Sequence, residues 1–208
     1  MPRKFLLLLC AALSLAAFAD ELAPDELVRR TTNDVLAVIR QDKEIQAGNL
    51  RKVGELAEAK VLPNFNFPRM TQLAVGRNWR EASDAQKEAL IREFRTLLVR
   101  TYSTSLAQYR NQTIDVKPAK YAPADTEVMV KTVVNQPGGQ PIPIDYTLEK
   151  NAQGWKAFDI VIDNVSLVTN YRSSFGDEIR KGGIDGLIKT LSERNSKASE
   201  PAAADKKK

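Results

Sequence analysis

The chain has 208 residues, 31 lysine and arginine against 26 aspartate and glutamate side chains, a formal net charge of +5 and no histidine. The lack of histidine excludes Ser-His-Asp and Cys-His nucleophilic sites and removes the commonest metal ligand, so we expect no metal site. A site built from carboxylates alone remains open. The charge excess is mild and no stripe of arginine and aromatic side chains accompanies it, so nucleic acid is not an expected partner.

The N-terminal segment has the layout of a secretory signal peptide. A basic start at Arg3-Lys4 precedes an apolar run, Phe5–Phe18, and a small-x-small cleavage site, Ala17-Phe18-Ala19. As a helix, this run of 14 residues would span only about 21 Å, short of a hydrocarbon core of roughly 30 Å. We therefore predict that residues 1–19 are removed and that a soluble mature chain is exported. The lone cysteine, Cys10, leaves with the signal.

The mature N-terminal half predicts helices. Pro24, followed by two acidic residues, suits the first turn of a helix that runs to about Arg40. Asn49 is a candidate cap for a second helix, which ends before Pro63. An apolar stretch around Pro68 then predicts a short helix that ends at Gly76.

The clearest helix follows. Ser83 and Gln86 form a capping-box pattern. Apolar side chains then recur at three- and four-residue spacing from Leu90 to Tyr109, with charged residues on the opposite side. This period predicts a long helix over 84–110 that lies on something apolar.

Beyond this helix the apolar period changes to two residues. Strands are predicted at 113–116, 127–134, 142–149 and 155–162, separated by short connections that include the turn-forming sequences Gln-Pro-Gly-Gly and Asn-Ala-Gln-Gly. Such tight connections indicate an antiparallel meander with one wet and one covered face.

The C-terminal part returns to helix. A helix is predicted from Val165 to Lys181, with Gly182-Gly183 as its C-cap, and a last helix contains Ile184 and Leu191. From Asn195 onward the chain lacks core-forming residues. We therefore predict one domain over 20–194 and a disordered tail over 195–208.

Four stretches resemble a known family. The stretch Trp155–Thr169, which reads WKAFDIVIDNVSLVT, resembles the signature of the Mla-pathway phospholipid carriers, the MlaC or toluene-tolerance auxiliary transport family. Gly182–Leu187 resembles the family's G-I-D-G-L segment, and Val61-Leu62-Pro63 and Ser83-x-x-Gln86 match in order. Asn164 departs from the pattern, where a glycine is common.

The resemblance implies an α+β fold in which helices pack on a curved four-stranded antiparallel meander sheet and enclose an apolar cavity, as in NTF2- and cystatin-like cones. It also implies a monomeric periplasmic protein that carries glycerophospholipid as cargo and needs no cofactor. The implied partners are an outer-membrane lipoprotein–porin complex and an inner-membrane ABC transporter complex with MCE domains.

The candidate cavity-lining residues belong to an inward row of the sheet, a facing helical row and the strand-to-helix junction. In chain order they are Leu73, Leu90, Phe94, Leu98, Tyr102, Val128, Val130, Ile144, Tyr146, Phe158, Ile160, Val165 and Leu167. Apolar residues at these spacings equally suit a filled core. Arg77, Trp79 and Arg80 are candidate head-group contacts at the mouth; the alternative is two solvated arginines and a packed indole.

Two other functions compete with a lipid carrier. One is an NTF2-like small-molecule enzyme in which Asp145 or Asp159 acts as a base beside Tyr146. Strand alternation opposes it, because both carboxylates alternate with the inward row. The other is a periplasmic adaptor with a filled core and no ligand.

Overall fold

The computed structural model describes residues 22–197. The predicted signal peptide, 1–19, and the tail from residue 198 lie outside the described residues. The last helix continues to Lys197, so the domain extends three residues beyond the predicted boundary at 194. The reason is Asn195, which is buried and whose side-chain amide donates to the backbone oxygen and Oε2 of Glu93, both at 3.0 Å.

The N-terminal helices begin where local capping chemistry predicts. Asn49 accepts a hydrogen bond from the Lys52 amide and opens the second predicted helix. A short helix before it was not predicted; Asp42 caps it by accepting from the amides of Glu44 and Ile45. The elements of this part are α1 (Pro24–Gln41), α2 (Lys43–Gln46), α3 (Leu50–Leu56), the π-helical η1 (Ala57–Val61) and the 3-10 turn η2 (Leu62–Asn64).

The middle helices confirm the predicted caps. Gly76 has φ +65° and ends the short helix, a conformation that glycine adopts without strain. Both bonds of the capping box between Ser83 and Gln86 form, at 3.0 and 3.2 Å. The elements are α4 (Phe67–Val75), the 3-10 helix η3 (Gly76–Arg80) and α5 (Asp84–Ala107), which ends three residues earlier than predicted.

The sheet has five strands in the order β1-β2-β3-β4-β5, and every neighbouring pair is antiparallel. The α+β class is therefore confirmed, but the predicted number of four strands is wrong. The strands are β1 (Thr113–Val116), β2 (Glu127–Asn135), β3 (Ile142–Asn151), β4 (Gly154–Ile162) and the short β5 (Val165–Ser166).

The extra strand arises from a two-residue turn. Asp163 and Asn164 both have positive φ, 48° and 65°, as in the tight turns that join antiparallel strands. The chain therefore reverses at once, and Val165 pairs with Ile162 in β5 instead of starting a helix. The helix begins at Leu167, where Asp159 accepts from the Val168 amide at 3.1 Å and from the Ser166 hydroxyl at 2.6 Å.

Asn164 has a positive φ, a conformation that asparagine and glycine adopt more readily than other residues. We expect Asn164→Gly to leave the free energy of unfolding nearly unchanged. Asn164→Ala should lower the free energy of unfolding by about 1 kcal/mol. A positive φ is unfavourable for alanine, which lacks the side-chain hydrogen bonds to the backbone by which asparagine offsets this strain. Urea unfolding of both variants tests this, and equal stabilities of the two would contradict it.

The register places the predicted inward row on one face. Val130 lies opposite Tyr146, and Tyr146 lies opposite Ile160. A β-bulge interrupts the pairing of β3 and β4 after Thr147, so that Thr147 pairs with Asp159 and Leu148 with Ala157. Phe158, between Asp159 and Ala157, is therefore the extra residue of β4, and both Ala157 and Phe158 are buried.

The last helix, α6 (Leu167–Lys197), breaks at Gly183, which has φ +67° and ψ −170°. This break divides α6 into the two helices that were predicted on either side of Gly182-Gly183. The second half is tied to the start of α5, since the Gln86 side chain donates to Asp185 at 2.7 Å.

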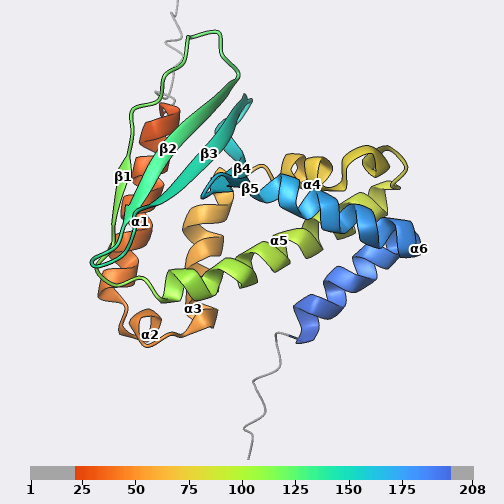
Figure 1. Cartoon of the computed structure of the whole chain (residues 1–208), viewed down its shortest axis with the longest axis horizontal. Helices are drawn as coiled ribbons and strands as arrows, with labels where there is room; N and C mark the ends of the chain where they lie inside the picture. Colours follow the sequence, from red (N-terminus) through yellow and green to blue (C-terminus); the bar gives the residue numbers. More distant parts are fainter. Residues whose placement is uncertain (1–21, 198–208) are drawn as a thin grey trace, which may run out of the picture.

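Figure 1 shows the sheet and α1 on one side, α4 and α6 on the other, and α5 running from the α6 side to the lower end of the sheet. No helix within residues 22–197 has the length and apolar character needed to cross a bilayer.

The buried apolar side chains of residues 22–197 form three clusters. The helical cluster joins α4, α5 and α6 to β4, the N-terminal cluster joins α1, α2 and α3 to the end of α5, and the sheet cluster joins α1 to β1–β4. Half-buried Phe65 and Ile114 are shared between clusters. The largest fully buried members are Phe94, Phe175, Met70, Leu90, Leu187 and Leu191 in the helical cluster, Ile39, Ile45 and Val53 in the N-terminal cluster, and Leu148 and Val130 in the sheet cluster.

Candidate functional site

At one end of its inner face, the sheet carries apolar side chains that are not part of any buried cluster. Ile142 and Ile144 on β3 and Ile162 on β4 are half-buried and belong to none of the three clusters. Ile144 lies directly opposite Ile162, so these side chains form one continuous apolar surface. Tyr146 and Ile160, the next pair along the strands, extend it toward the sheet and helical clusters.

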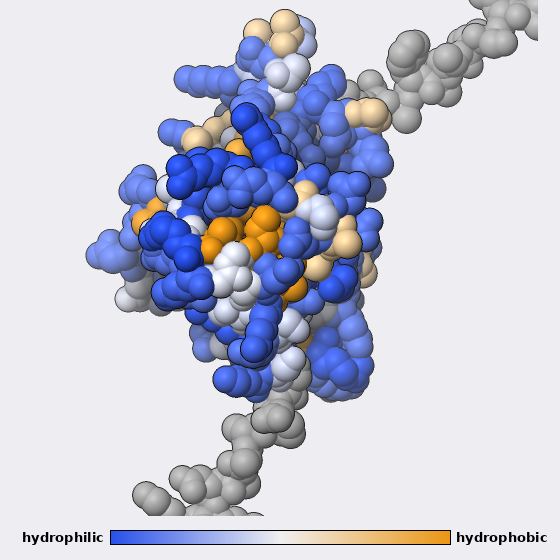
Figure 2. Space-filling model, turned by 90° about the vertical axis from the view of Figure 1, so that its right-hand side faces the viewer, coloured by the Kyte–Doolittle hydropathy of each residue, from blue (hydrophilic) through white to orange (hydrophobic). Residues whose placement is uncertain are grey.

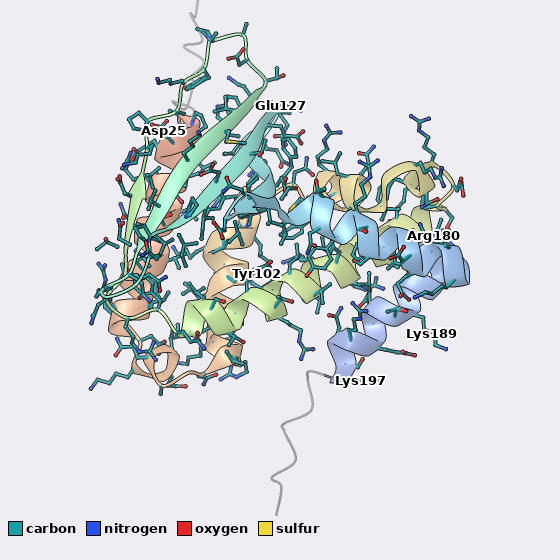
Figure 3. The ribbon with its side chains drawn as sticks, viewed as in Figure 1. Asp25, Tyr102, Glu127, Arg180, Lys189 and Lys197 are labelled. Atoms are coloured by element: carbon teal, nitrogen blue, oxygen red, sulfur yellow. The ribbon has the colours of Figure 1, made fainter. Side chains whose placement is uncertain are left out.

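Helix α5 runs from the α6 side toward the lower end of the sheet (Figure 1). It packs against α3, α4 and α6, and no strand is among the elements with which it makes extended contact. Tyr102, 36% exposed, lies on α5 below the sheet (Figure 3), one turn after Leu98. We take the uncovered sheet face and the second half of α5 as the candidate site and call the region between them the wedge.

Two tyrosines are among the residues assigned to the wedge. Burial raises the pKa of Tyr146 above the ordinary value of 10.0, although the side chain keeps part of its surface accessible. Burial also raises the pKa of Tyr102, and the nearby Tyr171 adds to the shift. A tyrosine hydroxyl is a donor of the kind that an ester or phosphate oxygen accepts.

This burial predicts an alkaline loss of stability. A tyrosine of the unfolded chain loses its proton near pH 10, while folded Tyr146 holds its proton to higher pH. The free energy of unfolding therefore falls as pH rises above about 10. We expect Tyr146→Phe to reduce this pH dependence, measured by urea unfolding across that range, and Tyr121→Phe, at an exposed tyrosine, to leave it unchanged. Equal slopes in both variants would contradict the assignment.

The structure places most of the predicted cavity residues at the border of the wedge or inside the clusters. Leu90, Phe94, Leu98, Phe158 and Leu167 are buried in the helical cluster, with Leu73 and Ile160 half-buried against it. Val128 and Val130 are buried in the sheet cluster, and Tyr146 packs against it. Val165 is 58% exposed because it lies on the edge strand β5, so it does not lie in the interior.

The three predicted mouth residues lie elsewhere. Arg77, Trp79 and Arg80 are in η3, whose extended contacts are with α4 and α6. Trp79 is half-buried against the helical cluster, with the Lys87 ammonium 6.0 Å from its ring, and both arginines are exposed. Figure 2 shows the end of the molecule formed by the turn of α6, where an apolar centre is surrounded by hydrophilic side chains.

The two candidate carboxylates of an enzyme lie away from the wedge. Asp159 accepts from Ser166 and Val168 at the start of α6, so its bonds are structural. Asp145 pairs with Lys131 and Val161 in the register, which places it on the face opposite Ile144. Residues 22–197 contain no group of three or more histidine, cysteine, aspartate and glutamate side chains that could hold a metal ion.

Ile142 and Ile162 were not among the predicted cavity residues. Both alternate correctly with the inward row, so their period was a usable signal. What the period could not show is that the helices leave this end of the sheet uncovered.

The structure does not match the enclosed apolar cavity that the family resemblance implied. The two pockets described for residues 22–197 have volumes of about 390 and 410 Å³, and neither is lined by residues of the wedge.

Comparisons with known proteins agree with this fold. The chain is 27% identical over 190 residues to toluene tolerance protein ttg2D of Pseudomonas putida, covering 91% of this chain and 87% of that protein. It is 23% identical over 182 residues to the intermembrane phospholipid transport system binding protein MlaC of Haemophilus influenzae, covering 86% and 77%.

A solved structure is also similar. The phospholipid-binding protein from Ralstonia solanacearum, in complex with a phospholipid, superposes with a TM-score of 0.81 at 39% identity, covering 86% of this chain and 100% of that chain. The family model described as MlaC protein matches residues 29–193. The chain therefore belongs to the MlaC family.

Proposed function

We propose that the chain is a periplasmic phospholipid carrier that holds acyl tails in the wedge between β3, β4 and α5. The observation that carries the proposal is the row of half-buried side chains, Ile142, Ile144 and Ile162, that belongs to none of the three clusters. The family and the phospholipid bound to the similar solved protein support it.

The energetics of the cargo explain why a carrier needs such a surface. A diacyl phospholipid has about 30 methylenes, each worth roughly 0.8 kcal/mol on burial, so bare transfer through water is opposed by about 24 kcal/mol. A carrier must offset nearly all of this with apolar contact, and it needs no reacting group. Exchange with a membrane is then close to neutral in free energy, so direction comes from the partners.

The proposed route runs between two membrane complexes. The name of the Haemophilus influenzae relative describes intermembrane phospholipid transport. We propose that this chain likewise shuttles glycerophospholipid between an outer-membrane lipoprotein–porin complex and an inner-membrane ABC transporter complex with MCE domains. Its export depends on the proposed signal peptide at residues 1–19.

Lipid extraction tests the proposal. The mature chain is purified without detergent, extracted with organic solvent, and the extract is analysed by mass spectrometry; a delipidated sample is then incubated with labelled phospholipid vesicles. We expect close to one phospholipid per chain in the extract, and uptake from the vesicles. A lipid-free extract together with no uptake would contradict the proposal and favour an adaptor without a ligand.

A further inference from the structure

A polar pocket lies apart from the wedge, where the ends of three helices meet. It has a volume of about 390 Å³ and is lined by Ile39, Arg40, Gln46, Tyr109, Arg110 and Asn111. These residues come from the last turns of α1 and α2 and from the segment that follows α5. The volume is at the lower end of the range for small-ligand pockets.

The floor of this pocket is buried, and its other four lining residues are exposed. Ile39 and Tyr109 are 1% and 7% exposed and belong to the N-terminal cluster. The Tyr109 hydroxyl accepts from Arg40 Nη2 at 3.3 Å and donates to the Gln112 carbonyl oxygen. The Gln46 amide donates to the carbonyl oxygens of Ile39 and Arg40 at 3.2 and 2.6 Å. The pocket is thus held by bonds between its own lining residues.

The two arginines have different roles. Arg110 donates to the backbone oxygens of Ala107, Tyr109 and Gln46 at 2.7, 2.6 and 2.9 Å, so it joins the ends of α5 and α2 and its charge is shared with their carbonyl groups. Arg40 donates to the neutral Tyr109 hydroxyl, which leaves most of its five donors available.

No acidic side chain is among the six residues that line the pocket. The next two acidic residues after Arg40 in the chain, Asp42 and Glu44, form ion pairs with Lys52 at 3.4 and 2.9 Å. An oxyanion in the pocket would supply a counter-charge, and the planar fork of a guanidinium fits phosphate geometry.

We propose that this pocket binds the phosphoryl group of a small phosphate ester, with Arg40 as the main ligand and Arg110 and Asn111 contributing further donors. The ester is a membrane lipid head group or a soluble glycerol phosphate, which share this chemistry. The site is separate from the wedge and does not rest on the proposed carrier function.

Nuclear magnetic resonance tests the site directly. The mature chain, labelled with nitrogen-15, is titrated with sn-glycerol 3-phosphate, and with glycerol as the uncharged control. We expect saturable shifts of the Asn111 and Gln46 amide signals with the phosphate ester only. Arg40→Gln should weaken binding about tenfold, because it removes a charge-assisted contact. Arg30→Gln, at an exposed α1 arginine that does not line the pocket, should not.

A second arm identifies the source of the phosphate. Co-sedimentation of the wild type, Arg40→Gln and Arg30→Gln with phosphatidylglycerol and phosphatidylcholine vesicles is compared. Weaker sedimentation of Arg40→Gln than of Arg30→Gln assigns the site to lipid head groups, even when glycerol phosphate gives no shift. Absence of both responses, or equal responses of the two variants, overturns the proposal. Phospholipid in the extract of Arg40→Gln should match the wild type, so failure here leaves the carrier function untouched.

Discussion

Replacing Ile144 by tryptophan is expected to weaken phospholipid loading strongly while the chain remains folded. Ile144 is half-buried, lies opposite Ile162 and belongs to no cluster, so an indole can enter the wedge without displacing a packed neighbour. It would take the room of about four methylenes, each worth roughly 0.8 kcal/mol. A bound tail then loses about 3 kcal/mol, and the affinity falls roughly a hundredfold. The phospholipid-to-protein ratio after extraction measures this.

The matched control for this variant is Met129→Trp. Met129 is 46% exposed on β2 and adjoins Val130 in sequence, so its side chain lies on the opposite face of the sheet. The same indole there should leave lipid loading unchanged. Equal loading of Ile144→Trp and the wild type would show that the wedge does not hold the tails, and equal losses in both variants would point to a general effect on the sheet.

Replacing Phe94 by alanine is expected to produce the largest loss of stability. Phe94 is fully buried, and its ring makes edge-to-face contacts with Tyr171 and Phe175 at centroid distances of 5.0 and 5.1 Å. It therefore joins α5 to α6. Truncating such a phenylalanine costs about 3–5 kcal/mol, a large share of the roughly 5–15 kcal/mol by which domains are stable. Urea unfolding measures the change.

Leu50→Ala is the control for Phe94→Ala. Leu50 is 49% exposed at the start of α3, so its truncation should change the free energy of unfolding by no more than about 0.5 kcal/mol. A loss below about 1 kcal/mol in Phe94→Ala would show that the helical cluster re-packs around the missing ring.

Sequence reasoning succeeded where the signal is local. The caps at Asn49, Gly76 and Ser83 depend on side chains that bond to amides two or three residues away, or on a backbone angle that glycine tolerates, and all three form. Strand period likewise predicted that Val130, Tyr146 and Ile160 share a face. The two short elements, α2 and β5, were missed because four and two residues are too few to show a period.

The candidate site was harder to predict, because the alternation of a strand shows which face a side chain occupies and not what covers it. Val130 and Ile144 follow the same alternation, yet Val130 is fully buried under α1 and Ile144 is not. That difference depends on where α1 packs on the sheet. The position of the η3 arginines was hard to predict for a related reason: the path of the chain between α4 and α5 depends on tertiary contacts with α6.

The bulge in β4 was also beyond sequence reasoning. Strict alternation predicts Phe158 and Ile160 on the inner face, and this agrees with the structure. One extra residue, however, lets adjacent Ala157 and Phe158 serve different clusters, the sheet cluster and the helical cluster. A bulge leaves no composition signal unless it contains glycine.

The division of the buried side chains into three clusters has a thermodynamic consequence. Tails lying in the wedge would contact α5 and the uncovered end of the sheet at once, so the cargo would act as an additional piece of the hydrophobic core. A ligand that binds only the folded state raises its stability by RT ln(1 + [L]/Kd), about 2.7 kcal/mol at a concentration of 100 Kd. The melting temperature of the chain would then report how much lipid it carries, and proteases would remove empty chains faster than loaded ones.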